Sequence, residues 1–437
     1  MKITDIRSAI ENGAYDKAFA ALYGADFDKK AVYERYTKAV ESFKELYEDK
    51  ISSDADICLF SVPGRSEIIG NHTDHNHGRV VAAGISLDII AVAAKTDAHE
   101  IRIKSEGFDE DICDTKNVET VVEEQKYKAC AIIRGMCDGF ERSGYKTGGY
   151  FAYTTSNVLK GSGLSSSAAF EVMVGNILNH FYNDGKVDAV EIAKIAQYSE
   201  NVHFGKPCGL MDQTACAVGS FVAIDFENPK APIVEKLSFD LSSHGYSLCI
   251  VNTGGNHADL NDDYASVPAE MKAVAKYFGK EVLRDVDKGE IIANIPVLRE
   301  AVGDRAIMRA LHYCNENARV AKVTEALRND DLFGFLHGIK ESGLSSSTML
   351  QNTYTVKNVS EQGISLALAV AGQVLDSKPG TAYRVHGGGF AGTIQNFIPN
   401  EYLEEFTKVM KSVFGEDSVY VLKVRPYGAV SLSELCK

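Results

Sequence analysis

The sequence predicts an α+β protein with two lobes of comparable size, and three observations lead to this class. Runs rich in β-branched and aromatic residues alternate irregularly with segments of helical periodicity. The 437 residues exceed the usual size of one domain by about two- to threefold. A turn-forming Asn-Pro-Lys-Ala-Pro cluster at 228–232 interrupts the pattern near the middle. We therefore expect an N-terminal lobe over 1–225 and a C-terminal lobe over 226–437.

The expected elements follow from this patterning. Tyr33, Tyr36, Val40 and Phe43 have helical spacing, so a helical extension that packs against the core is expected over about residues 1–50. Further helices are expected near 128–142, 168–182, 188–203, 305–328 and 360–376. Strands are expected near 58–62, 80–96, 101–104, 150–155, 219–225, 246–253, 381–386, 390–398 and 419–424.

Composition limits the class of function. Lys and Arg number 46 against 60 Asp and Glu, so the net charge is 46 − 60 = −14, unlike that of most nucleic-acid binders. The nine cysteines are scattered and form no Cys-x-x-Cys pair, which argues against a zinc ribbon or a redox motif. No secretory signal is visible at the start, and the apolar stretch at 80–94 is interrupted by polar residues. We expect a cytoplasmic protein without nucleic-acid or membrane partners, and a monomer or weak homo-oligomer.

The strongest local signal is the segment Gly-Ser-Gly-Leu-Ser-Ser-Ser-Ala-Ala at 161–169, between an expected strand and an expected helix. Glycines let the backbone approach a ligand, and a helix N-terminus favours an anion. The pattern therefore favours phosphate binding, although a plain helix-capping loop has the same letters. Six of these letters recur at 342–347, where we expect a structural or substrate-side loop because no convincing helix follows.

Three other segments are rich in polar residues or glycine. The segment 63–78 holds Arg65, His72, Asp74 and two more histidines, but no zinc-type spacing, so it suits a hydroxyl-rich ligand better than a metal. Asp212 follows a short apolar run and by itself is typical of a turn or cap. The triple glycine at 387–389 indicates either close backbone approach or a tight hairpin.

Together and in this order, these motifs resemble the galactokinase family of the GHMP small-molecule kinases, over roughly residues 55–425. The resemblance implies two lobes with mixed sheets and helices, the active site in the cleft between them, and transfer of the ATP γ-phosphate to the anomeric hydroxyl of galactose. It implies that Asp212 accepts the proton of that hydroxyl and that Arg65 pairs with Asp212. It also implies Mg²⁺, with ATP as co-substrate, held by Ser166 and Glu200.

The resemblance assigns the remaining site residues in three groups. Those expected to bind ATP are Gly161, Ser162, Gly163, Leu164, Ser165, Ser166, Ser167 and Ala168. Those expected to bind the sugar are Asn71, His72, Asp74, Gly209 and Tyr264, and Gly387, Gly388 and Gly389 are expected to complete the cleft wall.

Two departures from the family pattern are visible. The family carries glutamate where this chain has Asn71, near the C6 end of the sugar, so a negative charge is lost there. This loss leads to the hypothesis that the enzyme accepts galacturonate, L-arabinose or another galactose relative such as N-acetylgalactosamine. His386 and Ala391 also depart from the family's last glycine-rich motif, which puts the donor geometry of that loop in question.

Two further readings compete with a sugar kinase. A non-catalytic sugar and ATP sensor is disfavoured because Asp212, Arg65, Glu200 and the serine loop are all present. A mevalonate or homoserine kinase is disfavoured by the His-Thr-Asp-x-Asn element at 72–76.

Overall fold

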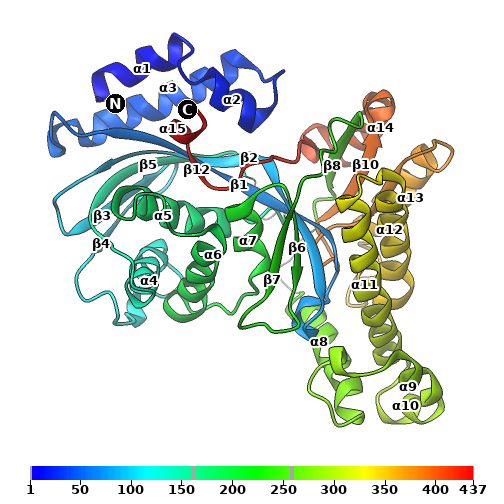
Figure 1. Cartoon of the computed structure of the whole chain (residues 1–437). Helices are drawn as coiled ribbons and strands as arrows, with labels where there is room; N and C mark the ends of the chain where they lie inside the picture. Colours follow the sequence, from blue (N-terminus) through cyan, green and yellow to red (C-terminus); the bar gives the residue numbers. More distant parts are fainter. Residues whose placement is uncertain (1, 159–162, 256–259, 437) are drawn as a thin grey trace.

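The computed structural model describes residues 2–158, 163–255 and 260–436, and has two lobes, each built around one β-sheet (Figure 1). The described part of the N-terminal lobe has an eight-stranded sheet, in which β12-β1-β2-β5-β3-β4 form one path and β6 and β7 continue from β2. The β3–β5 pair is parallel and the other pairs are antiparallel. The strands are β1 (Ile57–Ile69), β2 (Arg79–Lys95), β3 (Glu100–Ser105), β4 (Glu110–Asp114), β5 (Tyr150–Ser156), β6 (Phe221–Asp225), β7 (Ile233–Leu237) and β12 (Val430–Ser431).

Helices cover both faces of this sheet because alternate strand residues point to opposite sides. Leu59 and Val92, paired across β1 and β2, pack against the N-terminal helices, whereas the next pair, Phe60 and Ala91, belongs to the core on the other face. The outer cover consists of α1 (Ile3–Glu11), α2 (Asp16–Tyr23), α3 (Lys29–Tyr47) and the C-terminal α15 (Leu432–Leu435). The inner layer consists of α4 (Ala129–Arg142), α5 (Ser166–Tyr182), α6 (Ala189–Tyr198) and α7 (Met211–Val218). The expected helical extension therefore covers the outer face of the sheet, as Figure 1 shows.

The C-terminal lobe has a second sheet, four-stranded within the described ranges, in the order β11-β8-β10-β9. Cys249 and Val251 face α13 and α14, and Leu248 and Ile250 face the opposite side. The strands are β8 (Tyr246–Asn252), β9 (Ala382–Val385), β10 (Thr393–Pro399) and β11 (Val419–Leu422). The helices are α8 (Asn261–Tyr277), α9 (Lys288–Ala293), α10 (Ile295–Ala301), α11 (Asp304–Arg328), α12 (Leu332–Ser345), α13 (Gly363–Leu375) and α14 (Asn400–Phe414).

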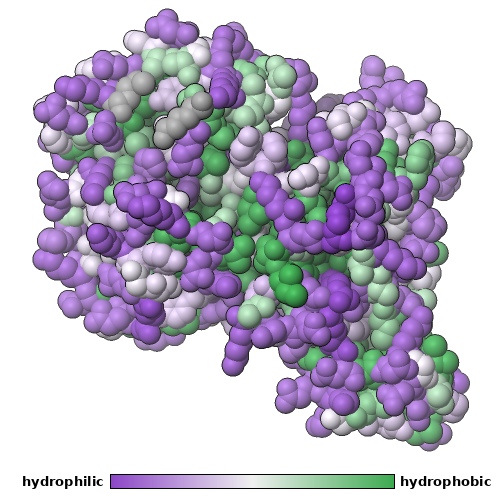
Figure 2. Space-filling view, in the orientation of Figure 1, coloured by the Kyte–Doolittle hydropathy of each residue, from purple (hydrophilic) through white to green (hydrophobic). Residues whose placement is uncertain are grey.

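The surface is hollowed between the two lobes, and hydrophobic side chains gather along this hollow (Figure 2). Both ends of the chain lie on the N-terminal lobe, because β12 pairs with β1 and α15 packs against α2. Across the described ranges, no helix has the length and apolar character needed to span a membrane.

The expected helices and strands are confirmed, with two corrections. The cluster at 228–232, expected to mark the lobe boundary, is the turn of the β6–β7 hairpin, which extends the first sheet to Leu237. The repeated motif at 342–347 is not a loop: it lies at the end of α12 and in the π-helical turn Ser346–Leu350. Its helical form is stabilised by hydrogen bonds of Ser342 to Glu316 and of Ser345 to His312.

Candidate active site

Asp212 and Arg65 form a two-pronged ion pair where the inner helices meet β1. The Arg65 Nε donates to Asp212 Oδ1 at 2.7 Å, and Nη2 donates to Oδ2 at 2.6 Å. Asp212 lies in the first turn of α7, and the Ser165 hydroxyl also donates to it. The side chain of Asp212 keeps 33% of its surface exposed against 10% for Arg65, so one side of the carboxylate is open to a ligand.

The protonation state of Asp212 is set by opposing effects. Burial alone would raise its pKa, but the Arg65 guanidinium and the Ser165 hydroxyl outweigh burial, and the pKa of Asp212 is lowered. The carboxylate is therefore ionised at neutral pH and able to accept a proton.

From Gly163 on, the motif expected to bind phosphate forms a tight turn that leads into α5. Gly163 (φ 72°) and Ser165 (φ 57°) both adopt the left-handed conformation, and α5 begins at Ser166. The carbonyl of Gly163 accepts a hydrogen bond from Arg65 Nη1, which connects the turn to the ion pair. Gly161 and Ser162, expected to bind ATP, lie outside the described residues. The N-terminus of α5 therefore lies beside Asp212, where it favours an anion.

A cavity of about 560 Å³ opens next to this helix start. Ser166 and Ser167 line one part of it together with two carboxylates, Glu171 and Glu200. The other walls are mainly apolar and include Phe108, Ile132, Phe170 and Phe204. An apolar cavity that ends in hydroxyl and carboxylate groups suits a nucleotide whose base enters the apolar part and whose phosphates reach α5.

The two carboxylates of this cavity are held together by one amide. Gln213 Nε2 donates to Glu171 Oε2 and to Glu200 Oε2, both at 3.0 Å, and both glutamates are buried. Burial, with the nearby charge of Glu200, raises the pKa of Glu171 to about 8, so Glu171 holds a proton at neutral pH until a bound cation displaces it. Adjacent buried carboxylates beside the Ser166 hydroxyl are hard oxygen donors, the kind that Mg²⁺ prefers. The residues present therefore fit Mg²⁺.

The groups expected to contact a sugar gather near Asp212, whose charge acts on Asp74. A side chain at position 209 would place its Cβ 3.2 Å from Asp74 Oδ2, so Gly209 lets the backbone approach that carboxylate. His72 Nε2 lies 2.9 Å from the carbonyl oxygen of Gly388, and the Tyr264 hydroxyl donates to the carbonyl of Gly389 at 2.9 Å. Burial raises the pKa of Asp74, while His72 opposes that shift. This side combines acceptors and donors suited to hydroxyl groups.

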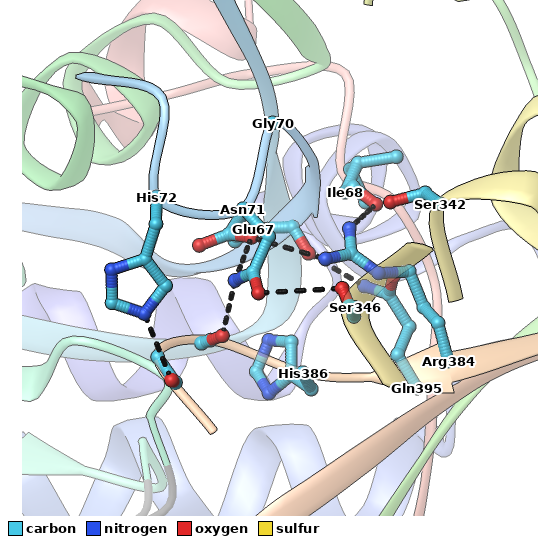
Figure 3. Close-up of polar contacts among 12 residues, drawn as sticks. Glu67, Ile68, Gly70, Asn71, His72, Ser342, Ser346, Arg384, His386 and Gln395 are labelled. Atoms are coloured by element: carbon cyan, nitrogen blue, oxygen red, sulfur yellow. Dashed lines mark hydrogen bonds and ion pairs between the residues drawn. The ribbon is translucent and has the colours of Figure 1, made fainter. Parts of the chain in front are cut away.

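Two residues that depart from the family pattern lie deeper than expected. Asn71 is fully buried behind His72, and its amide is bonded to protein groups (Figure 3), so its contact with a sugar stays a prediction. His386 lies between the hydroxyls of Ser66 and Thr393. Burial lowers the pKa of His386 to about 3, so the ring is neutral and adds no charge beside Arg65.

Comparison with known proteins agrees with this arrangement. Residues 41–95 match the galactokinase galactose-binding signature, and residues 130–220 match the GHMP kinase N-terminal domain. The galactokinase of Actinobacillus pleuropneumoniae is 31% identical over 354 residues, which cover 80% of this chain and 87% of that protein. The galactokinase of Clostridium acetobutylicum is 28% identical, covering 87% and 94% of the two chains. The chain belongs to the galactokinase family.

Solved structures agree on the fold of the family. The crystal structure of Lactococcus lactis galactokinase complexed with galactose superposes with a TM-score of 0.72 at 24% identity, covering 89% of this chain and 98% of that chain. A mevalonate kinase superposes with a TM-score of 0.57 at 14% identity. The two-lobed GHMP kinase fold is therefore confirmed.

Sequence reasoning did not single out several residues of this galactokinase-family site. Glu171 and Gln213 join Glu200 in the cavity, and Glu67 and Asn352 hold Asn71. Gln213 follows Asp212 directly in the sequence, which was a usable signal. No spacing in the sequence links Glu171 to Glu200, because their contact arises from the packing of helices that are distant in the chain.

Proposed function

We propose that this galactokinase-family enzyme transfers the γ-phosphate of ATP to the anomeric hydroxyl of galactose, giving galactose 1-phosphate and ADP. The observation that carries the proposal is the position of Asp212. Its open carboxylate accepts a hydrogen bond from Ser165, in the turn before α5, and lies close enough to Asp74 for the two charges to interact. A nucleotide at that turn and a sugar beside Asp74 would therefore meet at Asp212.

The geometry supports a direct transfer in which the protein mainly orients the reactants and stabilises charge. The anomeric oxygen attacks the γ-phosphorus while the bond from that phosphorus to the β–γ bridging oxygen breaks, and ADP leaves. Asp212 accepts the hydroxyl proton. Arg65, paired with Asp212, keeps that carboxylate ionised and places a positive charge beside the turn before α5, where its Nη1 donates to the Gly163 carbonyl. The N-terminus of α5 favours the phosphate charge.

The residues that would hold Mg²⁺ are Ser166 and Glu200, with Glu171 beside them. The ion, when bound with ATP, neutralises phosphate charge. The buried Gln213 amide keeps the two carboxylates in place for that task.

A coupled assay of ADP release with ATP and Mg²⁺ tests the proposal. The acceptors are galactose, L-arabinose, N-acetylgalactosamine and glucose, and a no-sugar control measures ATP hydrolysis. We expect the highest kcat/KM with galactose and a product whose anomeric phosphate is identified by ³¹P NMR. A higher kcat/KM with another sugar of the panel would identify that sugar as the substrate. Binding of sugar and ATP without turnover would indicate a sensor.

A further inference from the structure

A buried network joins the two lobes behind the sugar side of the site, and Asn71 lies at its centre (Figure 3). Asn71 Nδ2 donates to Glu67 Oε1 at 3.1 Å and to the carbonyl oxygen of Gly387 at 2.5 Å. Its amide oxygen accepts from Asn352 Nδ2 at 2.6 Å. Both ends of the amide are therefore used by protein groups.

A carboxylate would not fit at position 71 in this network. It has no N–H group, so it would face the Glu67 carboxylate and the Gly387 carbonyl with oxygens only. Like charges in contact within a buried site disfavour each other. The neighbours thus require an amide at 71, and the carboxylate of this region is on Glu67. The charge that the sequence suggested was lost is instead present four residues earlier.

The negative charge of the Glu67 carboxylate is only partly neutralised by neighbouring cations. Arg384 Nη2 lies 3.5 Å from Glu67 Oε1, a long contact, while Nη1 of the same guanidinium donates to the carbonyl of Ile68 at 2.8 Å. Gln395 Nε2 donates to the backbone carbonyl of Glu67 at 2.8 Å and fixes the strand there. Glu67 is therefore held in place, with Arg384 as its one ion-pair contact among the described residues and Arg65 within reach of its charge.

The same network holds the groups that face the acceptor. The Gly388 carbonyl accepts from both His72 Nε2 (2.9 Å) and Asn352 Nδ2 (3.1 Å), so Asn71 and Asn352 set the position of that loop against His72. The field of Glu67 also reaches the reaction centre. The pKa of Arg65 is raised, because the charge of Asp212 outweighs burial, and Glu67 adds to the raising effect.

We propose that Glu67 selects acceptors by charge, with Asn71 as its positioning partner, so that the site takes neutral sugars of the galactose type and rejects their uronates. The proposal rests on the proposed function and replaces the hypothesis that Asn71 admits galacturonate. An anionic acceptor would meet the carboxylates of Glu67, Asp74 and Asp212, against the two cations Arg65 and Arg384. The low effective dielectric of a closed site strengthens the repulsion between like charges.

The first test uses the wild-type enzyme with galactose, galacturonate and galacturonamide, the neutral amide of the same acid. We expect kcat/KM for galacturonamide to exceed that for galacturonate by at least about tenfold, since charge is the main difference between them. Equal values for acid and amide would overturn the proposal without any variant. Absence of ADP release with every sugar would overturn the proposed function and this inference together.

The second test assigns the effect to Glu67. Glu67→Gln should raise the galacturonate-to-galactose ratio of kcat/KM about tenfold or more, through a lower KM for galacturonate, while KM for ATP stays within about twofold. Glu404→Gln, on the exposed surface of α14, removes the same charge and should leave the ratio unchanged. Galactose turnover with an unchanged ratio in Glu67→Gln would overturn the inference alone. If that variant does not fold, the acid–amide comparison in the wild type decides.

Discussion

The protein holds two aspartate–arginine pairs of similar chemistry in different settings. Asp88 is 0% exposed and lies between the outer helices and the first sheet, where Arg35 Nη1 donates to it at 2.6 Å and Arg425 Nη1 lies at 3.3 Å. Tyr23 also donates to it, at 2.6 Å. Asp212, by contrast, has Arg65 and one hydroxyl as partners and keeps a third of its side-chain surface open.

The difference lies in what each pair connects. Asp88 joins α3, the sheet and the segment that returns from the second lobe, so each of its partners comes from a different part of the chain. Its charge is enclosed and satisfied, which is typical of a structural site. Asp212 is hydrogen-bonded on one side and exposed on the other, which is typical of a carboxylate that binds a ligand.

The largest expected effect is on the open pair. Asp212→Asn removes the proton acceptor and keeps the shape, so kcat should fall by about 10²- to 10⁴-fold while KM for galactose and ATP changes little. Steady-state kinetics with both substrates would measure this, and near-normal turnover would refute Asp212 as the base. Urea unfolding of the same variant should show a smaller loss of stability than Asp88→Asn.

The enclosed pair should respond in the opposite way. Asp88→Asn leaves the buried Arg425 without its counter-charge, so the free energy of unfolding should fall by about 3–5 kcal/mol, measured by urea denaturation. The folded fraction should keep a kcat within about twofold of the wild type. Asp54→Asn, which removes an exposed partner of Lys2, is the matched control and should cost about 1 kcal/mol or less. If Asp88→Asn lost turnover but not stability, the Asp88 pair would not be a purely structural site in contrast to Asp212.

On acidification, His312 near the cleft and Asp88 under the outer helices should lose their contributions to stability at different pH values. Near the cleft, burial lowers the pKa of His312 to about 4, while Glu316 opposes the shift. Its ordinary value is about 6.5, so the unfolded chain binds the proton first and stability falls as pH drops from about 6.5 toward 4, by about 1.4 kcal/mol per pH unit for each such histidine. The Arg35 and Arg425 charges outweigh burial and lower the pKa of Asp88, so its contribution is lost only below about pH 4.

Urea midpoints between pH 7.5 and 4.5 would test this order. His312→Gln should reduce the slope of the free energy of unfolding against pH by the equivalent of about one proton. Asp88→Asn should lower the free energy of unfolding over the same pH range without changing that slope. An unchanged slope in His312→Gln would show that this ring is not the group that titrates.

The sequence anticipated Asp212 and Arg65 because their motifs carry a family resemblance, and the structure brings the two side chains into contact. It did not anticipate Glu171 and Gln213, whose contacts depend on how α5 and α7 pack. Asn71 shows a different limit. A single letter suggested a lost charge, but Glu67, which contacts it, carries that charge, and the contact is visible only in three dimensions.

Most of the fold followed from periodicity, since the long helices and the buried strands have strong patterns. The repeated serine motif was misjudged because the same letters form a turn in one place and a helix end in the other. The conformation of the motif depends on its tertiary contacts: at 342–345 the serine hydroxyls form hydrogen bonds with Glu316 and His312 on α11.

The return of the chain's last segment to the first lobe has a consequence for biosynthesis. β12 and α15 complete the sheet edge and the outer cover that α1, α2 and α3 begin, so the N-terminal lobe cannot finish folding while its last residues remain within the ribosome. The C-terminal lobe, although synthesised later, contains all of its own strands before that moment. Removal of β12 and α15 therefore disturbs the half of the protein made first.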